Sequence, residues 1–289
     1  MCGRFALFAD DDWLVSLFGV DLLEGEHAAS WNQAPSQQIR VVFDQAAPAS
    51  PSSPVPASSS PPASVPASSS SPTAPAPSRD MPRARRKLRS LQWGLVPGWA
   101  RTPDRPMINA RAETLVEKPS FRAAAARRRC LIPANGYFEW QAPSSGSGPK
   151  QAWFLSSGGG RSLDEGDPVV AFAGLYEAWR APSPDPGGGA GARPVRAGRE
   201  QDDGRWLLTC AIVTRAATDA LGRIHDRMPV VVPPELWDAW LDPDLTDLDG
   251  VNRLLRAIPD PQLVPRRVGS AVGSVRNDGP DLIAPLGPA

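Results

Sequence analysis

The stretch "CLIPANGYFEW" at residues 130–140 decides the fold class of this chain, because its apolar and aromatic residues predict β-structure in the middle of the sequence. Stretches of the same character lie on both sides of it. They are "QIRVVF" (38–43), "LRSLQWGLVP" (88–97), "QAWFL" (151–155), "VVAFAGLYEAW" (169–179) and "WLLTCAIVT" (206–214). The chain is therefore predicted to be rich in strands.

Four helices are predicted among these strands. Residues 10–19 begin with aspartates that can cap a helix and end at Gly19, and residues 120–129 combine a Ser cap with strong helix formers. Residues 233–241 open on prolines, which a first turn tolerates, and residues 245–258 form the fourth helix. Strands and helices alternate irregularly, which predicts an α+β fold with a mixed, largely antiparallel sheet flanked by short helices.

Two segments of biased composition interrupt this pattern. Residues 46–78 consist almost entirely of Ala, Pro and Ser, and residues 181–204 are rich in Gly and Pro. Such segments bury too little apolar surface to offset the entropy of ordering them. Because the parts between them are too short to fold alone, we expect a single domain over residues 1–289, with both segments as disordered or loop insertions.

Composition and charge exclude several classes of protein. The formal net charge is +0, so no global field attracts nucleic acid, and any anion site must be local. The three cysteines are widely spaced, form no CxxC pair and have only two histidines to complete a metal site, so no zinc, metal or other cofactor is expected. We find no signal-peptide pattern and no apolar stretch of about 18 residues, which predicts a cytoplasmic protein without a membrane partner.

Cys2 follows the initiator methionine directly, in "MCGRF". Removal of Met1, which small second residues permit, would leave a free α-amine and a thiol on one residue. This 1,2-aminothiol is a distinct nucleophile. The alternative is an inert, buried packing cysteine, which is the usual state of a free cysteine in proteins.

Further candidates for chemistry lie in five polar stretches. They are "WNQAPSQ" (31–37), "WGLVPGWA" (93–100), "INARAET" (108–114), "NGYFEW" (135–140) and "IHDRMP" (224–229). These stretches offer Asn109, Glu139 and His225 as polar or titratable groups. A Glu139 carboxyl beside aromatic residues could be desolvated, which raises its pKa towards the range of a general acid.

Each candidate also has an ordinary structural interpretation. Trp93 and Trp99 are of a type more often found in a core, and Asn109 could cap a turn. Glu139 could be an exposed strand residue, and His225 could be a surface histidine. The basic run at residues 83–89 could follow a nucleic-acid strand, although a solvated charged face is the commoner outcome.

Taken together, the stretches resemble the SOS response-associated peptidase family, whose module is called the SRAP domain. The matching motifs, in order, are "MCGRF", "WNQAPSQ", "WGLVPGWA", "INARAET", "CLIPANGYFEW", "FAGLYEAW", "CAIVT", "IHDRMPVVV" and "SAVGSVRNDG". The insertions fall between these motifs. The resemblance implies the SRAP fold and a protein that senses abasic sites in single-stranded DNA.

Members of this family become covalently joined to the lesion, and the residues carried over by motif suit that chemistry. The resemblance implies that the amine of processed Cys2 forms an imine with the opened sugar and that its thiol closes a thiazolidine ring. Asn109 would hold the sugar, Glu139 would move protons, and His225 would act as acid or base at the opened sugar. The DNA would be contacted by Arg4, Asn32, Trp93, Trp99, Arg111, Thr214 and Arg227.

The same resemblance suggests peptidase activity that removes Met1, by self-processing or by a host enzyme, together with a lyase-like activity. We expect a monomer that associates with the nucleoid when bound to damaged DNA. Two other functions stay open from the residues: a cysteine hydrolase that uses Cys2 with His225, and a non-catalytic single-stranded DNA-binding module.

Overall fold

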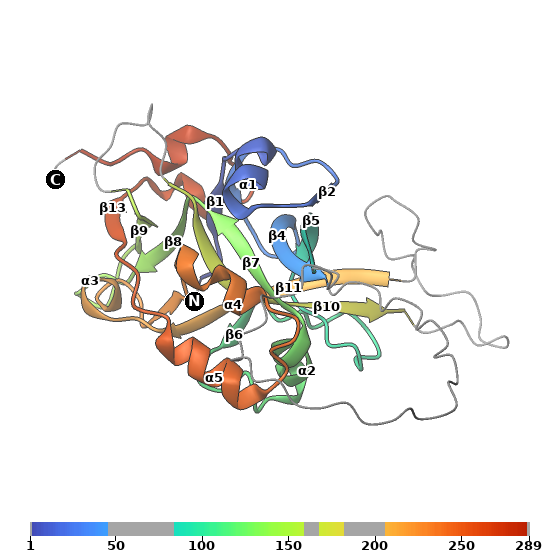
Figure 1. Cartoon of the computed structure of the whole chain (residues 1–289). Helices are drawn as coiled ribbons and strands as arrows, with labels where there is room; N and C mark the ends of the chain where they lie inside the picture. Colours follow the sequence, from blue (N-terminus) through green and yellow to red (C-terminus); the bar gives the residue numbers. More distant parts are fainter. Residues whose placement is uncertain (1, 46–83, 159–167, 182–205, 288–289) are drawn as a thin grey trace, which may run out of the picture.

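The computed structural model describes residues 2–45, 84–158, 168–181 and 206–287. The predicted insertion at 46–78, and that at 181–204 except for residue 181, lie outside the described residues. Within the described parts the fold is α+β, as predicted, with two β-sheets and short helices (Figure 1).

The larger sheet closes on itself to form a barrel-like core. Its strands run in the order β12-β11-β10-β7-β4-β5-β2, and β5 also pairs in parallel with β11, which closes a ring of β11, β10, β7, β4 and β5. Strand β6 adds to β11 in parallel, so the sheet is mixed. The strand bounds are β2 Leu22–Glu24, β4 Gln38–Gln45, β5 Arg85–Trp93, β6 Asn109–Arg111, β7 Arg129–Ala134, β10 Val170–Arg180, β11 Trp206–Ala216 and β12 Arg227–Pro229.

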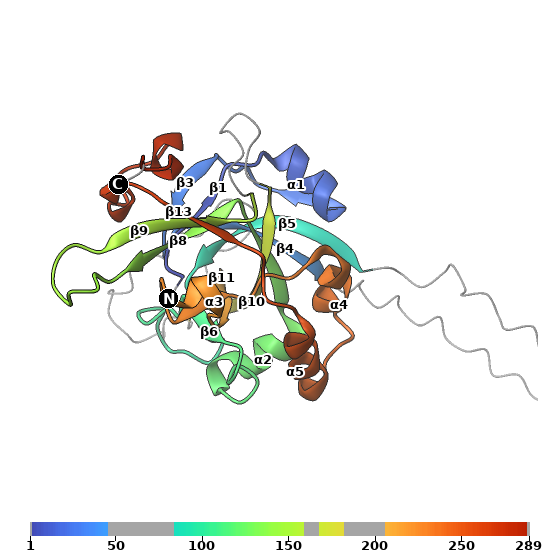
Figure 2. The ribbon, with the colours of Figure 1, turned by 90° about the vertical axis from the view of Figure 1, so that its left-hand side faces the viewer.

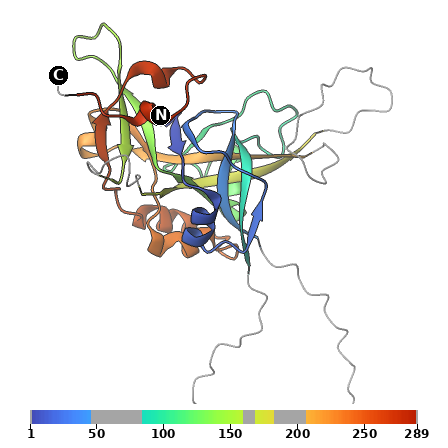
Figure 3. The ribbon, with the colours of Figure 1, turned by 90° about the horizontal axis from the view of Figure 1, so that it is seen from above.

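The smaller sheet has five strands in the order β13-β9-β8-β1-β3, each antiparallel to its neighbour. Their bounds are β1 Phe5–Leu7, β3 Ser30–Gln33, β8 Gly136–Gln141, β9 Gln151–Ser156 and β13 Val264–Arg267. The β8–β9 hairpin (green) projects from one side of the molecule in Figures 2 and 3. This sheet brings the first residues of the chain beside β8.

The helices lie outside the sheets. Helix α1 (Asp11–Phe18) is capped by the Asp10 side chain and ends at Gly19, whose φ is 62°. The others are α2 (Pro119–Arg127), α3 (Asp219–Gly222), α4 (Trp237–Leu241) and α5 (Leu248–Ala257), with single 3₁₀ turns at Pro234–Leu236, Ser270–Gly273 and Pro280–Ile283. Figures 1 and 2 show α2, α4 and α5 gathered on one side of the barrel. No helix among the described residues is both long and apolar enough to span a membrane.

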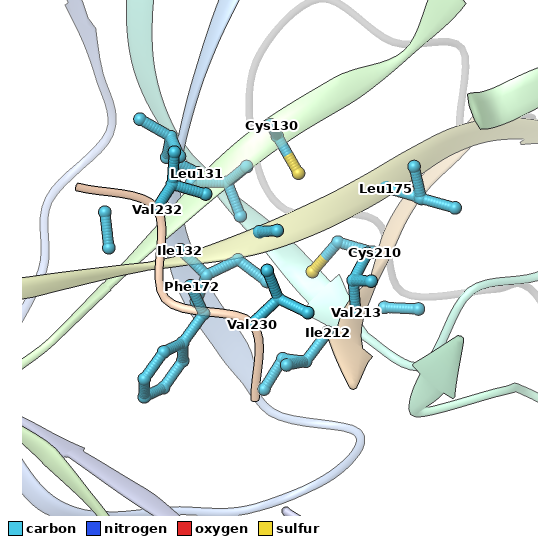
Figure 4. Packing of buried hydrophobic residues seen from close by; sticks show 14 of the residues in the cluster. Cys130, Leu131, Ile132, Phe172, Leu175, Cys210, Ile212, Val213, Val230 and Val232 are labelled. Carbon is cyan, nitrogen blue, oxygen red and sulfur yellow. The ribbon is translucent and has the colours of Figure 1, made fainter. Parts of the chain in front are cut away.

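The core fills the barrel and the space beneath the helices. Figure 4 shows part of it, where Ile132, Phe172, Ile212 and Val230 meet from four segments of the chain. Gly174 of β10 pairs with Cys130 of β7 on one side and with Ile212 of β11 on the other. A Cβ at Gly174 would lie 2.8 Å from the Cys130 sulfur. Cys130 and Cys210 are buried in this core, and burial raises the pKa of both thiols.

Three local predictions need correction. Residues 130–140 form two strands in different sheets, because the chain crosses from the barrel to the smaller sheet at Asn135, whose backbone N–H bonds to Ala6 and whose Oδ1 accepts from Phe8. The predicted helix at 120–129 begins at Pro119, so Ser120 is not its cap. The predicted helix at 233–241 is a 3₁₀ turn followed by α4.

Candidate functional site

The candidate site begins at Cys2, which is buried just before β1. Its backbone oxygen accepts a hydrogen bond of 3.0 Å from Nδ2 of Asn109. Asn109 is the first residue of β6 and is positioned by parallel pairing with Ile212 of β11. Its Oδ1 is buried without a hydrogen-bond partner among the described residues, so an acceptor is left for a ligand next to Cys2.

Glu139 reaches the same place from β8. Strand β8 pairs with β1 through Phe5 and Tyr137, and the N–H of Phe138 donates to the backbone oxygen of Arg4. Glu139 is buried, and this desolvation raises the pKa of its carboxyl above the ordinary value of 4.5. Burial also raises the pKa of the Cys2 thiol, and the Glu139 charge adds to that rise. The thiol is therefore held in its protonated form beside a carboxyl group.

His225 completes the cluster from the loop between α3 and β12. Its Nε2 lies 4.0 Å from Oε2 of Glu139. On the other side of the ring, Nδ1 lies 2.8 Å from Oδ1 of Asp226 and 3.0 Å from the backbone nitrogen of Arg227. The structure thus brings together Cys2, Asn109, Glu139 and His225, which come from four separate segments.

A side-chain hydrogen bond links the smaller sheet to the loop that holds His225. Nε2 of Gln141, at the end of β8, donates a 3.0 Å hydrogen bond to the backbone oxygen of Arg223. The Gln141 amide is itself oriented by Nε1 of Trp153, which donates to its Oε1 at 3.1 Å. Because Glu139 and Gln141 share one strand, this hydrogen bond fixes the loop relative to the carboxyl group. No sequence pattern pointed to Gln141, since its partner is a backbone atom far along the chain.

Arg4 and Asn32, expected at the DNA surface, form an internal clamp. Nη1 of Arg4 donates to Oδ1 of Asn32 and to the backbone oxygen of Val272, both at 2.7 Å. Nδ2 of Asn32 donates to the backbone oxygens of Ser274 and Asn277. These bonds tie β1 and β3 to the C-terminal segment. The buried Asn32 amide is fully used inside the protein.

The two tryptophans of "WGLVPGWA" have different surroundings. Trp93 is fully buried, packs against Phe5 with ring centres 5.3 Å apart, and donates from Nε1 to the backbone oxygen of Ile108. Trp99 is 68% exposed in the loop between β5 and β6. Only Trp99 of this pair presents its ring to solvent.

The remaining three expected DNA contacts lie together at the end of β6 and β11. Arg111 is exposed and pairs in register with the buried Thr214. Arg227 donates twice to the Glu113 carboxylate, at 2.7 and 2.9 Å, and also to the backbone oxygen of Thr214. The Arg227 guanidinium lowers the pKa of Glu113, and the Glu113 carboxylate balances the charge of Arg227. Glu113 was missed because its partner is remote in sequence.

Three of the four described cations in the basic run of β5 form ion pairs within the protein. Arg86 bonds to Asp44 and Asp238, while Lys87 and Arg89 both pair with Glu24. The fourth, Arg85, is exposed and has no ion pair among the described residues. No group of three or more His, Cys, Asp or Glu residues that could hold a metal occurs among the described residues.

Comparisons with known proteins give the family of this chain and confirm its fold. The family model "SOS response associated peptidase (SRAP)" matches residues 1–275. The chain is 32% identical over 287 residues to abasic site processing protein YoqW of Bacillus subtilis, covering 98% of this chain and 99% of that protein. It is 27% identical over 216 residues to abasic site processing protein HMCES of Gallus gallus, covering 70% of this chain and 58% of that protein.

Solved structures show the same fold. A protein from Bacteroides thetaiotaomicron superposes with a TM-score of 0.63 at 18% identity, covering 99% of this chain and 100% of the other. A phage-related protein from Bordetella bronchiseptica gives a TM-score of 0.57 at 25% identity, covering 97% and 100%. With a family match over nearly its whole length, the chain belongs to the SOS response-associated peptidase (SRAP) family.

Proposed function

We propose that this protein processes abasic sites in single-stranded DNA by forming a covalent crosslink through Cys2 after Met1 has been removed. The observation that carries the proposal is the convergence of Asn109 and His225 on the buried Cys2 and Glu139. Membership of the SRAP family and the names of its relatives support the same lesion as substrate.

The chemistry follows from the groups present. The ammonium of processed Cys2 gives a proton to Glu139, and the free amine adds to the aldehyde carbon of the opened deoxyribose. Glu139 returns the proton as the carbinolamine hydroxyl leaves as water. The sulfur then bonds to the iminium carbon and closes a thiazolidine ring, while the thiol proton passes to Glu139. Overall, one water molecule and one proton are released for each adduct.

Asn109 and His225 have complementary roles in this scheme. Nδ2 of Asn109 holds the backbone of Cys2, and its unpartnered Oδ1 is available to a sugar hydroxyl. His225 faces Glu139 at 4.0 Å, a separation that is common before substrate tightens a site. It is suited to exchange protons with that carboxyl and to act at the opened sugar, including in reversal of the adduct.

Arg111 and Trp99 are the best-placed of the proposed DNA contacts. The exposed Arg111 can bind a phosphate, and the exposed Trp99 ring can stack on a base without reading sequence. Arg4, Asn32, Thr214 and Arg227 support the site through internal bonds, so we assign them positioning roles. Trp93 belongs to the core under β1.

The state of the thiol favours this function over a cysteine hydrolase. A hydrolase requires a thiolate nucleophile, but burial and the Glu139 charge raise the pKa of Cys2. Ring closure requires only a thiol that loses its proton to a nearby acceptor as it adds to the iminium. Peptidase activity is accordingly proposed only for the removal of Met1, and lyase-like strand cleavage only as a side reaction of the imine.

Intact mass spectrometry on the purified protein tests the proposal. Processed protein mixed with abasic single-stranded DNA is expected to form a heat- and SDS-stable adduct, at a mass equal to the sum minus one water. Undamaged single-stranded DNA of the same sequence should give none. Peptide turnover without an adduct would favour the hydrolase, and salt-sensitive binding that ignores the lesion would favour a simple binding module.

Two variants separate an aminothiol mechanism from a thiol mechanism. A protein with residues fused before Cys2 keeps the thiol but has an amide in place of the amine, so it should bind abasic DNA and form no stable adduct. Processed Cys2→Ser should form an imine that borohydride traps. If the fused protein crosslinks as fast as the processed one, with the extension shown intact, the mechanism is wrong.

A further inference from the structure

The proposed reaction leaves one proton on Glu139, a group with little direct access to water. The Glu139 side chain is 5% exposed, so the proton must leave through a neighbouring group. His225 faces it and is 28% exposed, and the next residue, Asp226, is 84% exposed. Exposure therefore rises in steps from the buried carboxyl to the solvent.

The distances along this path allow a relay. The gap between Oε2 of Glu139 and Nε2 of His225 is 4.0 Å, and that between Nδ1 of His225 and Oδ1 of Asp226 is 2.8 Å. The second distance is that of a strong, charge-assisted hydrogen bond. The first is longer than a direct hydrogen bond, but it is a distance that closes when a site tightens around its substrate.

Nδ1 of His225 has a partner in both of its protonation states. When Nδ1 carries a proton, it can donate to the Asp226 carboxylate. When Nδ1 has lost that proton, its lone pair can accept from the backbone N–H of Arg227 at 3.0 Å. A merely packed histidine needs only one of these contacts. The pair of contacts stabilises the ring before and after it passes a proton.

Resting on the function proposed above, we propose that Asp226 is the solvent-side terminus of a proton relay that runs from Glu139 through His225. The Glu139 proton moves to Nε2 as Nδ1 releases its own proton to Asp226, which passes it to water. His225 ends as the neutral tautomer with Nε2–H, and its Nδ1 accepts from Arg227.

Asp226 acts through His225 in this scheme, so it is a positioning and relay residue. The relay requires a carboxylate at this position. Asp226→Glu should therefore retain most of the rate, while Asp226→Asn and Asp226→Ala should slow adduct formation by roughly tenfold. DNA affinity should stay the same, because the exposed side chain lies on the solvent side of His225.

Buffer rescue distinguishes a relay from a structural role. The adduct rate of each protein is measured on abasic single-stranded DNA in dilute MOPS and again with added imidazole as a small proton carrier. We expect imidazole to restore Asp226→Ala towards the wild-type rate and to leave wild type unchanged. Asp238→Asn is a matched control, because Asp238 is 83% exposed and bonded to one cation, Arg86, away from the site. Its rate should equal that of wild type.

The outcomes are distinct. An Asp226→Ala rate equal to wild type in dilute buffer overturns the relay, as does a loss that imidazole fails to restore at unchanged DNA affinity. If wild type itself forms no adduct in either buffer, the proposed function fails, and the relay fails with it.

Discussion

Burial of Glu139 serves the proposed function but lowers the stability of the folded protein when the carboxyl group is ionised. The carboxyl group is useful because it is buried beside Cys2 and His225, where its proton affinity is raised. The same burial makes its ionised form costly to the folded state. One substitution can therefore separate the two effects.

Glu139→Gln should slow adduct formation by roughly 10²–10⁴-fold, the range typical of a general acid or base. The amide keeps the shape of the side chain, so DNA affinity should change little. Quenched time courses on SDS gels give the rate, and fluorescence anisotropy on the same oligonucleotide gives the affinity. An unchanged rate would remove Glu139 from the mechanism.

Glu139→Gln should also stabilise the folded protein near neutral pH. Since the pKa of Glu139 is raised in the folded state, the unfolded chain loses its proton first as pH rises above about 4.5. Between that pH and the folded-state pKa, wild type loses stability that the amide retains. Melting temperatures of the two proteins should be similar near pH 4 and diverge towards pH 7. A variant less stable than wild type at pH 7 would contradict this sign.

Arg111→Ala should weaken binding to single-stranded DNA and reduce the slope of log affinity against log salt by roughly one unit. Arg256→Ala, an exposed arginine on α5 in the helical layer, is the control and should change neither. Anisotropy titrations at several salt concentrations measure both quantities. Equal slopes for wild type and Arg111→Ala would show that no phosphate is bound there.

Sequence motifs contain four residues that the structure brings close together, but they do not show which of the expected DNA contacts are exposed. Cys2, Asn109, Glu139 and His225 lie in short, ordered motifs, and the structure brings them together. Motifs do not reveal which polar groups are already used internally. The Asn32 amide forms hydrogen bonds with three residues, and Trp93 is buried and bonded to Ile108. Most of these partners are distant in sequence, so no local motif reveals them.

At the scale of elements, the junction between β7 and β8 determines where Glu139 lies. An apolar run looks the same whether its strand continues or changes sheet, so the crossing at Asn135 could not be predicted from periodicity. Gly136 allows the crossing through close packing. A Cβ at this position would lie 2.4 Å from Cζ of Phe154 and 2.6 Å from the backbone oxygen of Leu155.

Gly136→Ala should therefore destabilise the protein by about 1–3 kcal/mol or more, because both obstructing groups belong to the packed strand β9. Gly269→Ala is the matched control. Its φ is −64°, and a methyl group added there would have no atom within 4 Å, so stability should change little. Urea denaturation measures both. If the two variants unfold at the same midpoint, Gly136 is not required for the crossing.

At the scale of the whole molecule, local strand signals predicted the α+β class. They could not predict that the larger sheet closes into a barrel. Closure depends on the parallel pairing of β5 with β11, at Gln92 with Thr209 and Trp93 with Cys210. Such a pairing joins segments more than a hundred residues apart and leaves no local pattern. The same topology leaves the ends of β4 and β5 adjacent, which makes the insertion between them testable.

Gln45 of β4 and Arg85 of β5 are directly paired, so a short turn can replace the chain between them. The other end of this strand pair is formed by Gln38 and Gln92. That other end is the one next to Trp93 and the candidate site, so the insertion lies at the far end of the two strands. Replacing residues 46–84 with Asn-Gly should therefore leave the adduct rate unchanged. Stability should stay equal or rise slightly, because each halving of a flexible loop reduces its closure cost by about 0.6 kcal/mol.

Calorimetry and the SDS-gel assay measure the two properties, and a protein with residues 46–78 scrambled is the control for composition and length. If the insertion is a passive loop, the scrambled protein behaves as wild type, and the shortened protein melts at the same temperature or a few degrees higher. A shortened protein that melts well below wild type, or that loses the adduct while the scrambled one keeps it, would show that the insertion contributes to the domain. A loss in both variants would assign that contribution to its specific sequence.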